Sequence, residues 1–238
     1  MSNEYRILPE NSPLYMPLPY KYNDFEKISV YCECDPNGIR KLLPSVFEPV
    51  SNIVEFFILQ NNEIEGLRNY SEGGVVIPCK YKNIVGGHVA FEWVTTDDAL
   101  CAGREIWGYP KKLGEVTFDS NETGAVGTIS RNGAVLFEME INYKEKNLEL
   151  PSLQPRLIVK RILNSHNNEL SIDQVIMNQV ENSRTSIVKT AEAKITINTV
   201  VDDPIHVLNP SSVIGGQYIR GEFLLTYGRL VEDFLESQ

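Results

Sequence analysis

Two adjacent lysines, Lys111 and Lys112, are the residues of this sequence best suited to chemistry. They follow Pro110 and precede a Leu-Gly step that ends at Gly114. A lysine acts as a covalent catalyst only through its neutral amine, and burial or a neighbouring cation lowers its pKa toward neutrality. The pair therefore predicts an amine nucleophile, although Lys-Lys pairs also occur on solvated surfaces. Pro110 and the flanking glycines favour a fixed, non-repetitive backbone path.

The segment around this pair, residues 102–115, reads AGREIWGYPKKLGE. It resembles the Schiff-base segment of the acetoacetate decarboxylase family, in which the first lysine forms an imine with a ketone. In that family the second lysine is the known example of a cation that lowers the pKa of its neighbour. The resemblance implies that Lys111 forms the imine, that Lys112 modulates its pKa, and that the protein is a lyase.

The resemblance covers nearly the whole chain. The run Leu-Pro-Tyr-Lys-Tyr at 18–22 looks like the family's entry motif, and the stretch 70–78 resembles its Tyr-x-Glu-x-Gly-x-x-Ile-Pro pattern. Glu72 in that stretch falls on the family's active-site carboxylate, so we expect it to orient substrate or move protons rather than to be a plain turn carboxylate. The segments 155–160 and 193–196 fit the same pattern.

Two departures from the family pattern concern the chemistry. Phe25 stands where the decarboxylases carry an arginine, and Phe57 stands at the position of a second glutamate. Glu55 would share a strand face with Phe57, so a shift in register would restore a carboxylate. We expect the two rings to replace charge with apolar lining, which favours a more apolar keto acid than acetoacetate.

Three functions remain open on these residues. The first is decarboxylation of a small β-keto acid, acetoacetate or a more apolar relative, through a lysine iminium. The second is an aldolase or dehydratase that uses the same lysine on a keto acid, and the two phenylalanines favour it. The third is a non-catalytic binder that keeps the fold, which the retention of both lysines disfavours.

Further residues are candidates for the substrate pocket. Tyr109 would lie beside the imine and either donate a hydrogen bond or only pack. Arg104 and Glu105 either form an ion pair that supports the loop or contact a substrate carboxylate. Tyr218 matches a family histidine, and His88 lies on a predicted strand that could face a pocket.

Composition excludes several other functions. The net charge of −10 disfavours nucleic-acid binding, which needs clustered lysine and arginine. The cysteines at 32, 34, 79 and 101 lack a Cys-x-x-Cys spacing and are expected to be reduced and mostly buried, so we expect neither a metal nor a cofactor. The sequence shows no N-terminal apolar signal segment and no apolar run of about 18 residues, which predicts a cytoplasmic protein away from membranes.

The elements that must position the lysine predict an α+β fold. Residues 1–24 read as an extended N-terminal arm that packs on its own or a neighbouring subunit of a homo-oligomer, and residues 25–238 as one domain. Helices are expected at 37–43, 97–104 and 217–235, the second beginning with a cap at Asp97 or Asp98. Strands are expected at 28–34, 53–59, 75–81, 88–95, 115–118, 124–130, 134–143, 155–162, 172–179, 185–189 and 191–199. The resemblance implies mostly antiparallel, bent sheets that form a cone, or barrel, around the lysine.

Overall fold

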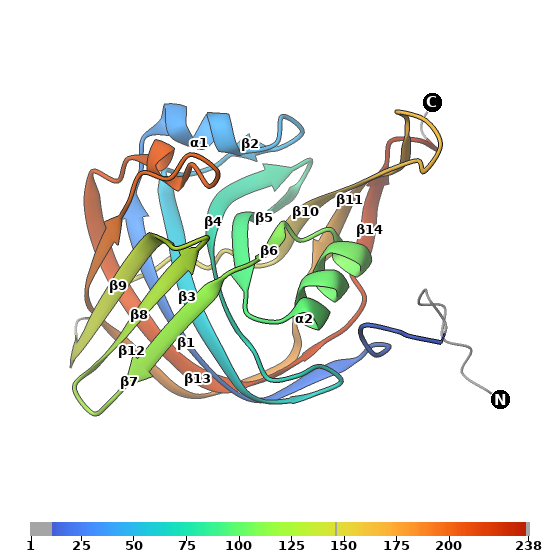
Figure 1. The fold of residues 1–238 in the computed structure, drawn as a ribbon. Coiled ribbons are helices and arrows are strands. Elements are labelled where there is room, and N and C mark those ends of the chain that lie inside the picture. The colour runs from blue at the N-terminus through green and yellow to red at the C-terminus, as the bar shows by residue number, and fades with distance from the viewer. Residues whose placement is uncertain (1–10, 146, 237–238) are drawn as a thin grey trace.

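A single curved sheet organises this chain in the computed structural model, which describes residues 11–145 and 147–236 (Figure 1). The strand order is β14-β11-β10-β5-β4-β3-β1-β13-β12-β9-β8-β7, with β2 paired to β4 and β6 paired to β5. The strands are β1 (Tyr20–Glu33), β2 (Glu48–Pro49), β3 (Ile53–Glu65), β4 (Ser71–Tyr81), β5 (Ile84–Val94), β6 (Lys111–Leu113), β7 (Glu115–Ser120), β8 (Gly124–Arg131), β9 (Ala134–Glu145), β10 (Arg156–Leu163), β11 (Leu170–Asn178), β12 (Glu181–Ile197), β13 (Ser212–Leu225) and β14 (Arg229–Asp233).

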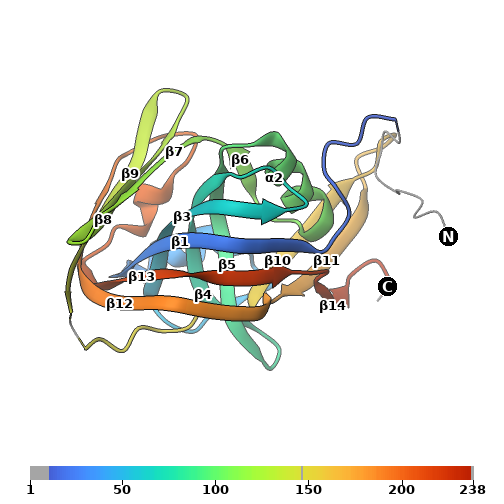
Figure 2. The same ribbon diagram turned by 90° about the horizontal axis from the view of Figure 1, so that it is seen from below.

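The predicted class, α+β and mostly antiparallel, is confirmed. Among the described strands, only β10 and β6 pair in parallel, both with β5. The several bent sheets of the expected cone are instead one continuous sheet, which stays open because β7 and β14 end it without pairing to each other. Bulges in β1 between Tyr22 and Phe25, and between Tyr31 and Cys32, bend its pairing with β13, and the long central strands curve together in Figure 2.

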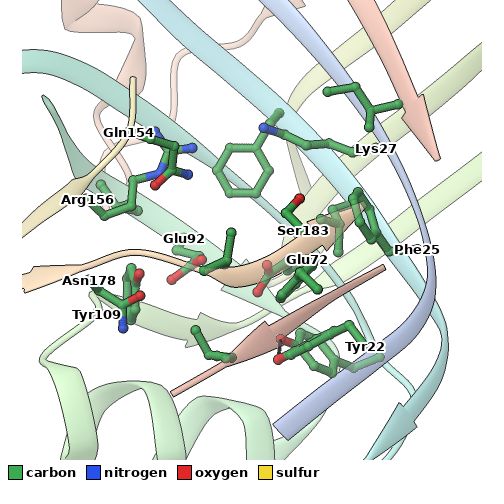
Figure 3. A pocket seen from close by; sticks show the side chains of 18 of the residues that line it. Tyr22, Phe25, Lys27, Glu72, Glu92, Tyr109, Gln154, Arg156, Asn178 and Ser183 are labelled. Carbon is green, nitrogen blue, oxygen red and sulfur yellow. Dashed lines mark hydrogen bonds between the residues drawn. The ribbon is translucent and has the colours of Figure 1, made fainter. Parts of the chain in front are cut away.

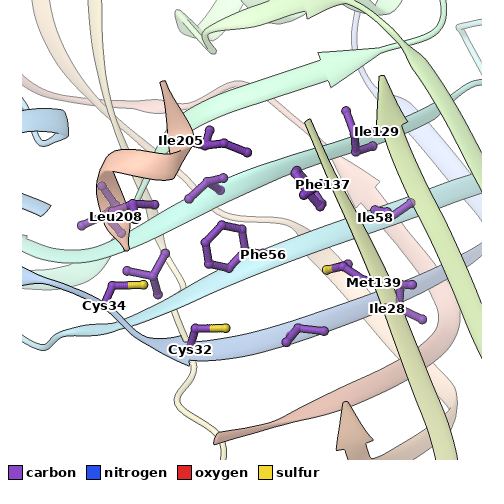
Figure 4. Packing of buried hydrophobic residues seen from close by; sticks show 14 of the residues in the cluster. Ile28, Cys32, Cys34, Phe56, Ile58, Ile129, Phe137, Met139, Ile205 and Leu208 are labelled. Carbon is purple, nitrogen blue, oxygen red and sulfur yellow. The ribbon is translucent and has the colours of Figure 1, made fainter. Parts of the chain in front are cut away.

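The alternation of side chains along β1 and β3 divides the interior into two regions. Ile28, Val30 and Cys32 of β1 pack in the main hydrophobic core with Phe56 and Ile58 of β3 (Figure 4). The residues between them point to the opposite face, because successive side chains of a strand alternate. That opposite face carries the polar residues described below.

The helices are short. α1 (Pro36–Leu42) begins at Asp35, whose carboxylate accepts a hydrogen bond from the Asn37 amide at 2.9 Å. α2 (Asp97–Ala102) continues directly into the π-helical turn η1 (Gly103–Trp107) and leads the chain toward β6. A 3-10 turn, η2 (Ile205–Leu208), packs against α1. Among the described residues, no helix has the length and apolar character needed to cross a membrane.

The helix predicted at 217–235 is wrong, because these residues form β13 and β14. β13 lies between β1 and β12 and pairs with both, so tertiary pairing outweighs the helical spacing of its apolar residues. The helical pattern also lacked a buried stripe, since Tyr227 and Leu230 are 73% and 50% exposed. The strands predicted at 185–189 and 191–199 are likewise one strand, β12.

The predicted N-terminal arm is shorter than expected where it is described. β1 begins at Tyr20, so the last five residues of the arm belong to the sheet. Tyr15 packs on its own chain, and its hydroxyl donates a hydrogen bond to Glu105 at 2.5 Å. Residues 1–10 of the arm lie outside the described residues.

Candidate active site

The face of the sheet opposite the main core holds a cavity of about 230 Å³ (Figure 3). Its lining combines an apolar wall with several charged and amide side chains. The lining residues are Tyr22, Phe25, Lys27, Phe57, Leu59, Tyr70, Glu72, Val89, Glu92, Tyr109, Lys111, Gln154, Arg156, Asn178, Val180, Ser183, Thr185, Ile219, Phe223 and Leu225.

Lys111 enters this cavity from β6, the short strand that runs parallel to β5. Its side chain is buried, and its Nζ donates a hydrogen bond to Glu72 Oε2 at 2.9 Å. The same nitrogen lies 5.2 Å from the ring centroid of Tyr70 and 5.8 Å from that of Tyr109. Gly103 leaves room for the lysine, because a Cβ there would lie 2.5 Å from Lys111 Cδ.

The surroundings of Lys111 hold it as an ammonium ion. Burial lowers the pKa of Lys111, but the carboxylate of Glu72, with a smaller contribution from Glu92 when it ionises, outweighs burial and the net pKa is raised. The lowered pKa expected from the lysine pair is therefore wrong for this arrangement. Lys111 becomes an amine only by passing its proton to a base, and Glu72 is in hydrogen-bond contact with it.

Lys112 points away from this site. Neighbouring residues of a strand face opposite sides, and Lys112 Nζ lies 2.6 Å from Asp203 Oδ1. Asp203 is buried and also accepts from Arg131 Nη1 at 3.1 Å. This geometry contradicts the role of pKa modulator that the resemblance implied for Lys112.

Glu92 is a cavity residue that the sequence reading missed. It lies directly opposite Lys111 in the β5–β6 pair, is 5% exposed, and its Oε2 has no hydrogen-bond partner. Burial raises the pKa of Glu92 to about 8, with a further contribution from Glu72 and an opposing one from Lys111. The carboxyl group is therefore mostly protonated at neutral pH. The sequence signal for Glu92 was a charged residue between two aromatic ones, Phe91 and Trp93, within a predicted strand.

A second ionic group lies on the same face. Glu55 Oε1 accepts from Lys27 Nζ at 2.5 Å, and Glu55 Oε2 accepts from Arg156 Nη2 at 3.2 Å. Ser29 donates a further hydrogen bond to Glu55 at 2.8 Å. Burial raises the pKa of Glu55, but these cations lower it more, to about 2, so it is ionised.

Phe25 and Phe57 line the cavity, as expected, and pack with Leu59 and Val89. The loss of charge expected from these rings is wrong. Lys27, two residues beyond Phe25 on the same strand face, and Arg156 of β10 supply cations to the lining. Glu55 does not line the cavity itself, but it holds both of these cations.

Of the other predicted pocket residues, one lines the cavity and four do not. Tyr109 lines the cavity beside Lys111. Arg104 donates to the Lys111 carbonyl at 3.1 Å and supports the loop, while Glu105 accepts from Tyr15. Tyr218 lies on the opposite face of β13 and donates to Glu26 at 2.8 Å. His88 contacts the Leu157 carbonyl through Nδ1 at 2.9 Å, and burial lowers its pKa to about 4.

The four cysteines are free thiols, and Cys32, Cys34 and Cys79 are buried, as predicted. In the described part of the chain, no three His, Cys, Asp or Glu side chains gather as a metal site would require.

Comparison with known proteins gives consistent results. A family model described as acetoacetate decarboxylase matches residues 6–235. The chain is 23% identical over 232 residues to an acetoacetate decarboxylase of Burkholderia vietnamiensis, which covers 96% of this chain and 94% of that protein.

Two solved structures share the fold. One is acetoacetate decarboxylase from Legionella pneumophila, with a TM-score of 0.88, 23% identity, and coverage of 98% of this chain and 95% of that one. The other is the enduracididine biosynthesis enzyme MppR complexed with pyruvate, with a TM-score of 0.82, 17% identity, and coverage of 96% and 98%. At these identities the two structures establish the fold alone.

Proposed function

This chain belongs to the acetoacetate decarboxylase family, and on that premise we propose that it decarboxylates a small β-keto acid through an iminium on Lys111. The observation that carries the proposal is the buried Lys111 Nζ in the cavity, 2.9 Å from the Glu72 carboxylate. A buried amine with a base in contact is the arrangement that a Schiff-base nucleophile needs.

Glu72 accepts the ammonium proton of Lys111 in the first step. The free amine then attacks the ketone carbon, and loss of water gives the iminium. The bond to the carboxylate carbon breaks, its electron pair forms the enamine double bond, and the iminium π electrons move to nitrogen. Carbon dioxide leaves at this point.

Glu92 completes the cycle as an acid. Its protonated carboxyl group delivers a proton to the enamine carbon, which restores the iminium, and water then hydrolyses the iminium to free the ketone. Its raised pKa, about 8, suits this step because a group that gives a proton near neutral pH must hold that proton beforehand. Glu72, paired with Lys111, and Glu92, unpaired at one oxygen, are in different surroundings and take different roles.

The aldolase or dehydratase alternative draws on the cations of the lining. Lys27 and Arg156 suit a carboxylate that remains on the substrate, and MppR, a similar fold, is described in complex with pyruvate, a keto acid. The same iminium on Lys111 serves that chemistry, with loss of a proton from carbon in place of loss of carbon dioxide. The retention of Lys111 in contact with Glu72 disfavours a non-catalytic binder.

Borohydride reduction in the presence of a keto acid tests the proposal. We expect wild-type protein to gain the mass of one reduced adduct per chain at Lys111, and Lys111→Ala to gain none. Analysis of the products separates the two reactions, since decarboxylation releases carbon dioxide and the shortened ketone. Equal trapping in Lys111→Ala would reject the assignment of the lysine, and an adduct without carbon dioxide release would favour the alternative.

A further inference from the structure

Arg156 and Asn178 form a cross-strand pair at one end of the cavity. They are direct partners in the antiparallel β10–β11 ladder, so their side chains lie on the same face, and both line the cavity. Figure 3 shows them at the end opposite Tyr22 and Phe25. Asn178 is 2% exposed and its Nδ2 has no hydrogen-bond partner. A buried amide donor without a partner is costly unless a ligand satisfies it.

Lys27 and Arg156 leave a surplus of positive charge on the lining of the same cavity. The two cations flank one carboxylate, Glu55, so the trio carries a net charge of +1 (two positive, one negative). Arg156 makes two hydrogen bonds among the described residues, one to Glu55 and one to the Leu153 carbonyl at 2.9 Å. A guanidinium group has five N–H donors, so others stay available to an anion.

We propose that Lys27, Arg156 and Asn178 form a subsite for a carboxylate that the substrate keeps through the reaction. This inference rests on the proposed function and narrows its substrate class to keto acids with a carboxylate besides the one that is lost. Planar donors of Arg and Asn match a carboxylate better than a neutral group, and the surplus charge is compensated when the anion binds.

The carboxylate that leaves is a poor occupant of this subsite. Decarboxylation moves negative charge out of the carboxylate and into the iminium, so cations that hold the reacting carboxylate stabilise the starting state more than the transition state. Cations that hold a second carboxylate stabilise both states equally and orient the ketone toward Lys111. The position of Arg156 therefore favours a specificity role.

Two probes of nearly equal shape test the subsite. Levulinate is a ketone with a remote carboxylate that does not decarboxylate as a β-keto acid does, and levulinamide is its neutral counterpart. For each probe we would measure the concentration that gives half-maximal borohydride trapping at Lys111. We would also measure equilibrium binding by calorimetry, which does not require an imine.

We expect wild-type protein to prefer levulinate over levulinamide by about tenfold or more, the value of a charge-assisted hydrogen bond. Arg156→Gln should abolish this preference because the trio then carries no net charge. Glu55→Gln should increase it because the net charge rises to +2. A purely structural role of the trio predicts no such opposite shifts. Arg161→Gln, an exposed position on the same strand, should leave both probes unchanged.

The outcomes separate the two proposals. Equal binding of the two probes by wild-type protein, or an intact preference in Arg156→Gln, would overturn the subsite. Unchanged levulinamide binding shows in each variant that the cavity has kept its shape. Failure of wild-type protein to trap either probe, with the levulinate preference intact in calorimetry, would instead remove the Schiff-base function and leave a carboxylate-binding cavity.

Discussion

At the residue scale, the protonation of Lys111 depends on nearby carboxyl groups and not on its lysine neighbour. Glu72 contacts its nitrogen, and Glu92 lies opposite it in the β5–β6 pair. The protein therefore places two carboxyl groups in different surroundings around one amine, one in contact with its nitrogen and one buried without a partner at Oε2. Such a pair can receive a proton at one step and supply one at another.

The orientation of Lys112 leads to a first prediction. Lys112→Ala should keep borohydride trapping at Lys111 within about twofold of wild type, because the two amines face opposite sides of β6. It should lower the free energy of unfolding by about 1–2 kcal/mol, since buried Asp203 loses one of its cations but keeps Arg131. Mass measurement and urea denaturation check the two effects. A tenfold loss of trapping would restore the role of Lys112 as pKa modulator.

Glu92 gives a prediction with a defined sign in pH. The ordinary pKa of 4.5 applies to the unfolded chain and about 8 to the folded one, so the folded protein binds more protons between these values. The contribution of Glu92 to the free energy of unfolding is therefore fully present below pH 4.5. It is lost as pH rises toward 8, by up to about 1.4 kcal/mol per pH unit.

The Glu92→Gln variant has no carboxyl group at this position, so it does not lose stability in this way as pH rises. The free energy of unfolding of the variant, measured with urea at pH 5.5, 6.5 and 7.5, should rise relative to wild type as pH increases. Glu115→Gln, an exposed glutamate of β7, is the matched control and should track wild type. A difference between Glu92→Gln and wild type that stays constant with pH would mean that Glu92 is ionised throughout.

At the element scale, α2 and η1 together set the position of the lysine. The chain leaves η1 through Gly108, whose φ of 89° is in the left-handed region that glycine adopts without strain. Lys160 packs where a side chain on Gly108 would lie, and Arg104 of η1 holds the Lys111 carbonyl. These contacts fix the backbone of β6, which is a strand of only three residues.

Gly103→Ala tests this positioning. Gly103 has an ordinary helical φ of −59°, so alanine brings no backbone strain, but its Cβ would lie 2.5 Å from Lys111 Cδ and 2.8 Å from Cε. The lysine must shift, and we expect the rate of imine trapping to fall about tenfold or more with little change in the melting temperature. Trapping kinetics and thermal unfolding measure the two. An unchanged trapping rate would show that the lysine tolerates displacement.

At the scale of the whole molecule, several large apolar side chains remain exposed on the single chain. Val188, Leu163, Leu230 and Tyr227 are exposed to between 50% and 73%. Such side chains favour association with other copies where they gather into a contiguous patch. We propose that the protein is a homo-oligomer.

Light scattering at micromolar concentration tests the oligomer. The expected mass is a multiple of the 26.9 kDa chain. The ratio of the measured mass to the chain mass should stay the same across a tenfold dilution, because an interface that buries these side chains is stable. A species of one chain mass at every concentration would contradict the proposal and leave the exposed apolar residues without a role in assembly.

The sequence by itself determined the family resemblance, the α+β class and which lysine lies in the cavity. These are local properties. A motif such as Gly-Tyr-Pro-Lys-Lys is read from adjacent residues, and most strands were predicted because their β-branched and aromatic residues bury a face wherever they pair. Glu72 and Tyr109 were found for the same reason, within motifs that the chain keeps intact.

The tertiary structure alone decided which groups act on Lys111. The orientation of Lys112 depends on the pairing of β6 with β5, and the pKa of Glu92 depends on burial among strands far apart in the sequence. Lys27 and Arg156 meet at Glu55 only because β1, β3 and β10 curve around one cavity. The 217–235 segment became strands because β1 and β12 flank it. Electrostatic energy and sheet pairing both depend on neighbours in space, which one-dimensional spacing does not specify.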